Sequence, residues 1–160
     1  MTDQVDCEHI KASALGEELD LDECRILSGA MTVRQLAAGE SLVDEGQADD
    51  NLYLLADGKL TVFTTTGGKE TTVYTLSPGE CAGTRAFIDR SPRKASLRAT
   101  RDSVVYTLAP DDFESLVDSH PRVVYKVMRA IFRVTHANLM RMNLESEQLL
   151  HYITKTGGRY

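Results

Sequence analysis

The stretch Pro78–Ala99 reads PGECAGTRAFIDRSPRKASLRA, and it decides both the fold and the candidate site. Its residue types predict a strand, a turn at Gly83, one turn of helix, a loop and a second strand. Free backbone N–H groups that follow a glycine turn at a helix N-terminus attract an anion such as phosphate. Arg93 adds a planar, permanently charged fork that matches two phosphate oxygens. This segment is therefore the best candidate for a binding site.

Runs of β-branched and aromatic residues lie on both sides of this segment, from Val33 to Ala109. Glycine-marked turns separate these runs, which predicts short strands arranged as a sandwich or barrel. The clearest runs cover residues 52–55, 59–63, 71–76 and 104–106. The second and third of these form a predicted hairpin, because Gly67 and Gly68 can adopt the positive φ values that its tip needs.

Helical patterns precede and follow the strands. The first thirty residues place Leu15, Leu19 and Leu27 among acidic groups, which indicates a short helical lead-in that stops near Gly29. A short helix is expected over residues 111–117, with acids in its first turn where the helix dipole favours them. His120 and Pro121 then end it and open a longer helix, because proline fits a first turn.

The last helix carries two apolar stripes, one more than a single core-facing helix needs. The stripe expected to face the barrel comprises Val124, Val127, Ile131 and Val134. The second stripe recurs at alternating spacings of four and three and comprises Met128, Phe132, Thr135, Leu139, Met142, Ser146, Leu149 and Ile153. That spacing lets two helices pack along a shared seam, which predicts a homodimer through the C-terminal helix. The alternative is a helix folded back so that the seam covers barrel surface.

Composition limits the function classes. Of the 160 residues, 42% are hydrophobic and 26% charged, as in an ordinary globular domain, so one domain is expected. A net charge of -6 disfavours a nucleic acid partner. No apolar run reaches the length of a membrane span, and the polar start lacks a secretion signal, so no membrane partner and a cytoplasmic location are expected. The three cysteines fit neither a disulfide framework nor a zinc site and are read as reduced packing thiols.

Catalysis is not expected. An enzyme on a similar β architecture would typically hold a metal through histidines on its strands, whereas His9, His120, His136 and His151 all lie outside the strand region. No nucleophile with an identifiable base and orienting partner is found. The sequence therefore predicts no catalytic residues, no metal site and no cofactor.

Five further segments carry a family resemblance together with the stretch quoted above. They are LAAGE at 36–40, EG at 45–46, NLYLL at 51–55, DGKL at 57–60 and LSPGE at 76–80. In order and spacing they resemble the cyclic-nucleotide-binding domain family, over about residues 20 to 145. The resemblance implies a mainly β fold, an eight-stranded double-sheet jelly roll with N-terminal helices and a long C-terminal helix. The expected boundaries are 1–30 for the helical lead-in, 31–110 for the jelly roll and 111–156 for the C-terminal helices, all in one structural domain.

The resemblance also implies a phosphate-binding cassette within Pro78–Ala99. The implied ligand-binding residues are Gly83, Thr84, Arg85, Ala86, Arg93, Lys94 and Ala95. Gly83 would keep the turn open for close approach of the backbone, and Arg93 matches the arginine that grips the cyclic phosphate. Asn138 falls where relatives offer a polar side chain to the purine across the dimer. The alternative for Asn138 is a solvated or seam-specifying side chain.

Three positions depart from the family pattern. Thr84 replaces the glutamate that would accept from the ribose 2′-hydroxyl, and losing such a charge-assisted bond costs about 1.5 to 3 kcal/mol. Ala82 replaces a phenylalanine and Arg85 a leucine. Positive charge at Arg85 and Lys94 could serve a more anionic phosphate ligand. The alternative is that both side chains extend into water while Arg93 pairs with Asp89 or another carboxylate.

Two functions follow as hypotheses. The first is a stand-alone regulatory module that binds cyclic AMP, cyclic GMP or another phosphate-bearing small molecule and signals through its C-terminal helices to a separate protein effector. The second is a ligand-free dimeric scaffold that keeps the fold. No DNA-reading helix-turn-helix or kinase is expected after the long helix. Cys81, beside the cassette, is read as a plain buried thiol, with oxidant sensing as the alternative.

Overall fold

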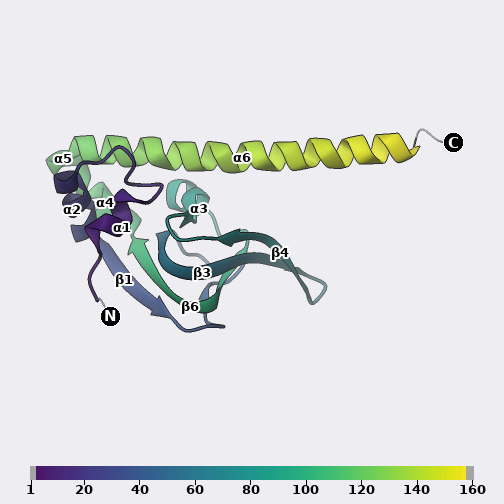
Figure 1. Cartoon of the computed structure of the whole chain (residues 1–160), viewed down its shortest axis with the longest axis horizontal. Coiled ribbons are helices and arrows are strands. Elements are labelled where there is room, and N and C mark those ends of the chain that lie inside the picture. Colours follow the sequence, from purple (N-terminus) through teal and green to yellow (C-terminus); the bar gives the residue numbers. More distant parts are fainter. Residues whose placement is uncertain (1–2, 158–160) are drawn as a thin grey trace.

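The computed structural model describes residues 3–157, which form a β shell flanked by helices at both ends of the chain (Figure 1). The helices described are α1 (Cys7–Lys11), α2 (Leu21–Gly29), α3 (Thr84–Asp89), α4 (Pro110–Glu114), α5 (Leu116–Ser119) and α6 (Pro121–Gly157). The strands described are β1 (Met31–Leu36), β2 (Ser41–Val43), β3 (Leu52–Thr66), β4 (Lys69–Leu76), β5 (Cys81–Ala82) and β6 (Ser96–Leu108).

Two long strands, β3 and β6, organise the shell by passing through both of its halves. In one half, β1 pairs with residues 103–108 of β6, which pair in turn with the start of β3, and β5 adds to β3. In the other half, β2 pairs with residues 97–98 of β6, and the later part of β3 pairs with β4. All these pairings are antiparallel. The eight segments of the expected jelly roll are thus carried by six strands among the residues described.

The bend that divides each long strand lies where Gly58 faces Ser103. The β3–β6 register shifts between Leu55 and Leu60. A Cβ atom at Gly58 would lie 2.6 Å from the Ser103 Cα, so only glycine permits this approach. The Ser103 hydroxyl accepts a hydrogen bond from the Lys59 backbone N–H, which satisfies a donor that the irregular ladder leaves free.

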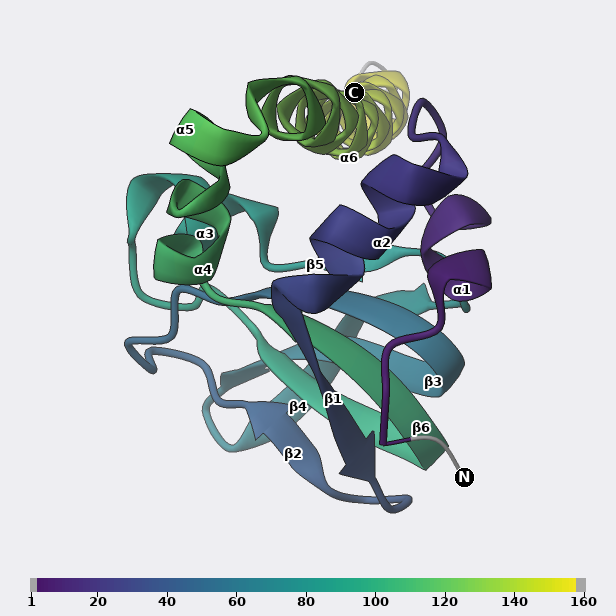
Figure 2. The same ribbon diagram turned by 90° about the vertical axis from the view of Figure 1, so that its left-hand side faces the viewer.

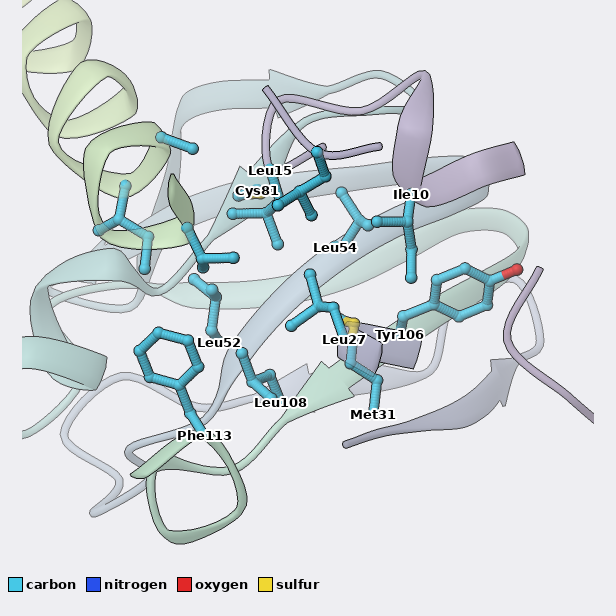
Figure 3. Packing of buried hydrophobic residues seen from close by; sticks show 14 of the residues in the cluster. Ile10, Leu15, Leu27, Met31, Leu52, Leu54, Cys81, Tyr106, Leu108 and Phe113 are labelled. Carbon is cyan, nitrogen blue, oxygen red and sulfur yellow. The ribbon is translucent and has the colours of Figure 1, made fainter. Parts of the chain in front are cut away.

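The helices close one open face of the shell, as seen end-on in Figure 2. α2 begins with a capping box in which Asp20 and Glu23 each accept from the other residue's backbone N–H. Leu27 of α2 packs with Leu52, Leu54 and Leu108 of the strands in the main hydrophobic core (Figure 3). The predicted helical lead-in and the predicted hairpin, with its tip at 67–68, are both found.

The C-terminal helices differ from the prediction in two details. The expected helix at 111–117 is divided into α4 and α5. The stripe that α6 buries contains Val127 and Ile131 as expected, but its other members are Val123 and Ala130, whereas Val124 and Val134 are only half-buried. Val124 nevertheless packs against the main core, so the prediction was wrong only at the end of the stripe, at Val134.

Ion pairs hold the first half of α6 to the N-terminal helical region. Lys126 Nζ lies 2.7 Å from Glu23 Oε1, and Arg129 Nε lies 3.2 Å from Glu18 Oε2. Arg133 also reaches Glu18, at 3.4 Å. These pairs and the buried stripe fix the direction in which α6 crosses the shell.

The C-terminal part of α6 projects beyond the shell (Figure 1). Phe132 is 69% exposed and Leu139 54%, and Leu149 and Ile153 are also exposed. The alternative of a helix folded back to bury its seam on the barrel is therefore wrong. None of the described helices is long and apolar enough to cross a membrane.

Candidate phosphate-binding site

The site residues expected from the sequence surround a single cavity of about 330 Å³. It is lined by all eight of them: Gly83, Thr84, Arg85, Ala86, Arg93, Lys94, Ala95 and Asn138. Further lining residues are Val62, Val73, Tyr74, Leu76, Cys81, Ala82, Ser91, Pro92, Leu97, Arg141 and Met142. The cavity has an apolar wall from the strands, a polar wall from the cassette and a side formed by α6.

The cassette has the predicted order of strand, turn, helical turn, loop and strand. β5 runs into Gly83, which adopts φ +86° and precedes α3, and the loop after α3 leads to β6. A Cβ atom at Gly83 would lie 2.2 Å from Arg93 Nη1 and 3.0 Å from the Asn51 carbonyl oxygen. Gly83 is thus required both by its backbone conformation and by the arginine that lies against it.

Arg93 is buried, with 6% of the residue exposed, and its guanidinium is partly engaged by the protein itself. Nη2 donates to Asp49 Oδ1 at 3.0 Å and to the Asn51 carbonyl, and the guanidinium carbon lies 5.4 Å from the centre of the Tyr53 ring. Nε is buried and has no hydrogen-bond partner among the described residues. The alternative in which Arg93 pairs with a carboxylate is therefore found, but the partner is Asp49 rather than Asp89.

Asp49 is the centre of this hydrogen-bond network. It accepts from the Tyr53 hydroxyl at 2.5 Å, from the Asn51 backbone N–H at 2.9 Å and from Arg93. Burial alone raises the pKa of Asp49, but these hydrogen bonds outweigh it and hold that pKa below its usual value. Burial and the bond to Asp49 raise the pKa of Tyr53 to about 12. The network keeps a charged pair at the inner end of the cassette.

The charge of the cavity wall is one-sided. It contains Arg85, Arg93, Lys94 and Arg141 and no aspartate or glutamate. Of these, only Arg93 forms an ion pair within the described part of the chain. Ser91 also contributes a buried hydroxyl without a hydrogen-bond partner there. The wall therefore offers several donors and no anionic acceptor, which suits a ligand rich in acceptor oxygens.

The helix α6 forms one side of the cavity through Asn138, Arg141 and Met142. The Arg141 guanidinium carbon lies 4.2 Å from the centre of the Tyr74 ring on β4. The Tyr74 hydroxyl donates to Glu80 Oε2 at 2.5 Å, and this bond, together with burial, raises the pKa of Tyr74. Arg141 thus connects α6 to the strand that forms the opposite side of the cavity mouth.

Four residues of the site network were missed by sequence reasoning: Asp49, Tyr74, Ser91 and Arg141. Arg141 could have been found, because it lies three residues after Asn138 on the same helix face. Ser91 lies inside the quoted cassette and was passed over. Asp49 lies in a loop with no regular spacing, so nothing local connects it to Arg93.

The histidines and cysteines have ordinary surroundings. Among residues 3–157, no three metal-binding side chains lie close enough to hold a metal ion. His9 Nδ1 lies 2.8 Å from the Tyr106 hydroxyl, away from the cassette. Cys81 is buried, and burial raises the pKa of its thiol to about 12, which argues against an oxidant-sensing thiolate. All three cysteines are free, as predicted.

The fold is thus a β shell with a cavity beside a long helix, and four cationic side chains line that cavity. A family model described as "Cyclic nucleotide-binding domain" matches residues 33–120, more than half of the chain. The chain belongs to this family.

Two of the similar proteins are a cyclic AMP receptor protein and a kinase regulatory subunit. The cyclic AMP receptor protein of Thermus thermophilus is 30% identical over 125 residues, which cover 78% of this chain and 58% of that protein. The cAMP-dependent protein kinase regulatory subunit of Blastocladiella emersonii is 31% identical over 107 residues, covering 66% of this chain and 27% of that protein. The chain thus spans less than two thirds of each relative.

The solved structure of the Thermus thermophilus catabolite activator protein supports the fold. It superposes with a TM-score of 0.76 and 28% identity, over 86% of this chain and 63% of that one. The predicted mainly β architecture with flanking helices and a long C-terminal helix is confirmed.

Proposed function

We propose that this chain is a regulatory module that binds a phosphate-bearing small molecule of the cyclic nucleotide type and passes the signal through α6 to a separate protein. The observation that carries the proposal is the cavity at the cassette, into whose wall Arg93 brings a buried, unpartnered Nε–H. A buried donor without a partner costs about 1 to 3 kcal/mol, and a phosphate oxygen would remove that cost.

The contacts of the cavity support the proposed transmission of the signal through α6. The cavity is bounded by the cassette and by α6, so a ligand that fills it contacts both. α3 packs through Phe87 against Phe113 of α4, with ring centres 5.5 Å apart. The C-terminal helices would have two arrangements, and the ligand would bind more tightly to one of them. Ligand binding in the cavity would shift the equilibrium toward that arrangement by this difference in affinity.

The exposed seam of α6 supports a homodimer as the second part of the proposal. Met128, Phe132, Leu139, Leu149 and Ile153 are all exposed and share one seam. An apolar stripe of this length on a projecting helix is typical of a surface buried by another helix. Asn138 lies beside this seam and lines the cavity, so a dimer would bring the partner helix close to the site.

A specific observation favours the ligand-free scaffold as a second candidate. Two of the polar contacts of Arg93 are already taken by Asp49 and Asn51, so the arginine is partly satisfied without a ligand. The two functions differ in whether any phosphate compound stabilises the chain.

A thermal-shift screen distinguishes them. We expect at least one phosphate compound, among cyclic AMP, cyclic GMP, nucleoside phosphates and inorganic phosphate, to raise the melting temperature by several degrees. A ligand at a hundred times its Kd stabilises by about 2.7 kcal/mol. The double variant Arg85→Ala, Lys94→Ala removes two exposed cations of the cavity wall and should weaken this shift, with Arg34→Ala on the distant strand β1 as matched control. No shift with any compound would contradict the sensor and leave the scaffold.

A further inference from the structure

The donor-rich wall of the cavity restricts the ligand class beyond the proposed function, on which this inference rests. Four cationic side chains line the cavity, and Asp49 compensates only one of them, Arg93. Arg85, Lys94 and Arg141 have no carboxylate partner among the described residues. A cyclic mononucleotide carries a single negative charge, which would leave most of this positive charge unmatched.

The cations approach the cavity from two different elements. Arg85 and Lys94 belong to the cassette, whereas Arg141 comes from α6 and lies over Tyr74 of β4. A single phosphate held at Arg93 and Ser91 would occupy only the cassette part of the wall. The α6 part therefore offers a second position for an anionic group.

No carboxylate is present to bind a ribose 2′-hydroxyl. Thr84 lines the cavity at the position of the family glutamate, is 8% exposed, and offers only a neutral hydroxyl. The residues that line the cavity include no aspartate or glutamate that could make this contact instead. The cavity therefore offers no charged acceptor that would make a ribonucleotide bind more tightly than its 2′-deoxy analogue.

We infer that the cavity selects a mononucleotide with two separate anionic groups, one at the cassette and one at Arg141, over a singly charged cyclic mononucleotide. The volume of about 330 Å³ is at the lower end for small-molecule sites and matches one nucleotide rather than a dinucleotide. The apolar side chains of Val62, Val73 and Leu97 provide a wall for the base.

The test compares three probes by titration calorimetry with the full chain: adenosine 3′,5′-bisphosphate, cyclic AMP and 2′-deoxy cyclic AMP. We expect the bisphosphate to bind at least about tenfold more tightly than cyclic AMP, because one added charge-assisted contact is worth that much. The two cyclic compounds should have dissociation constants that agree within about threefold, because no carboxylate contacts the 2′-hydroxyl. Arg141→Gln should weaken bisphosphate binding much more than cyclic AMP binding and so remove most of the preference for the bisphosphate, with Arg34→Gln as matched control.

A second variant tests the missing carboxylate. Thr84→Glu should weaken binding of the bisphosphate and make cyclic AMP bind more tightly than its 2′-deoxy analogue. Because glutamate at this buried position could unfold the chain, thermal unfolding is measured alongside, and the variant of the half-buried Arg141 gives an independent result. Tighter binding of cyclic AMP than of the bisphosphate, or a tenfold loss with the 2′-deoxy analogue, would overturn this inference and leave the proposed function standing. If none of the three probes binds, this inference is overturned, and the thermal-shift screen with its wider set of phosphate compounds decides the proposed function.

Discussion

Replacing Asp49 with asparagine is expected to lower the free energy of unfolding by about 3 kcal/mol or more. The substitution leaves the Arg93 guanidinium, 5% exposed in its side chain, without its charged partner and weakens the bond from the Tyr53 hydroxyl. Breaking a buried pair by removing one partner costs far more than the pair itself contributes, because the remaining charge stays buried. Chemical denaturation of both proteins at neutral pH measures the difference.

The neighbouring Asp50 provides the matched control, because Asp50→Asn removes a carboxylate from the same half-buried loop without touching Arg93. Phosphate ligands should stabilise the Asp49 variant more than the wild type, because the Arg93 guanidinium can then form an ion pair with the phosphate in place of Asp49. Equal stability of wild type and the Asp49 variant would show that the Asp49–Arg93 pair contributes little and would contradict this account of the network.

The same pair gives a pH dependence with a defined sign. The folded pKa of Asp49 is held below the ordinary value of 3.8, so the unfolded chain binds this proton first as pH falls. The stabilisation by Asp49 is therefore fully present above about pH 4 and is lost as the pH falls through the lowered folded pKa. The stability difference between wild type and Asp49→Asn should accordingly shrink in acid and be constant at neutral pH.

Placing a charge on the seam of α6 is expected to have the second large effect. Leu139→Asp puts a carboxylate into the interface from both copies, so the proposed dimer should dissociate with a Kd raised by at least about a hundredfold. Met140→Asp is the matched control, since Met140 is equally exposed, at 56% against 54%, but lies one position off the seam. Sedimentation equilibrium at micromolar concentration gives the result.

Three outcomes of that experiment matter. If the wild type and the Met140 variant are dimeric and the Leu139 variant is monomeric, the result supports the seam as the interface. A monomeric wild type overturns the homodimer. Equal effects of the two variants would place the interface on another face of the helix.

Much of the architecture was predictable because it depends on local signals. The β-branched and aromatic residues at 59–63 and 71–76, with Gly67 and Gly68 between them, predict a hairpin without reference to the rest of the chain. Pro121 after His120 marks the start of α6 correctly for the same reason. The merging of segments into β3 and β6 was not predictable, because it depends on the contact of Gly58 with Ser103, which are far apart in sequence.

The structure brings the eight expected site residues around one cavity, whereas the partner of Arg93 was not predictable. Seven of these residues lie within the short segment 83–95, so their convergence on one cavity follows from a local strand, turn and helix. Asp49 and Arg93 are 44 residues apart and meet only because the loop before β3 lies against Gly83. The end of the buried stripe of α6 was misplaced at Val134, because the 3.6-residue period alone does not show where the helix stops packing against the shell.

The most direct test of the central claim is a crystal structure of the chain grown with adenosine 3′,5′-bisphosphate or inorganic phosphate at saturating concentration. The account predicts a phosphate in the cavity, with one oxygen within hydrogen-bond distance of Arg93 Nε and others near Ser91 and the backbone after Gly83. A cavity without the anion at saturation, or an anion bound only outside the cassette while Arg93 Nε stays unpartnered, would contradict it.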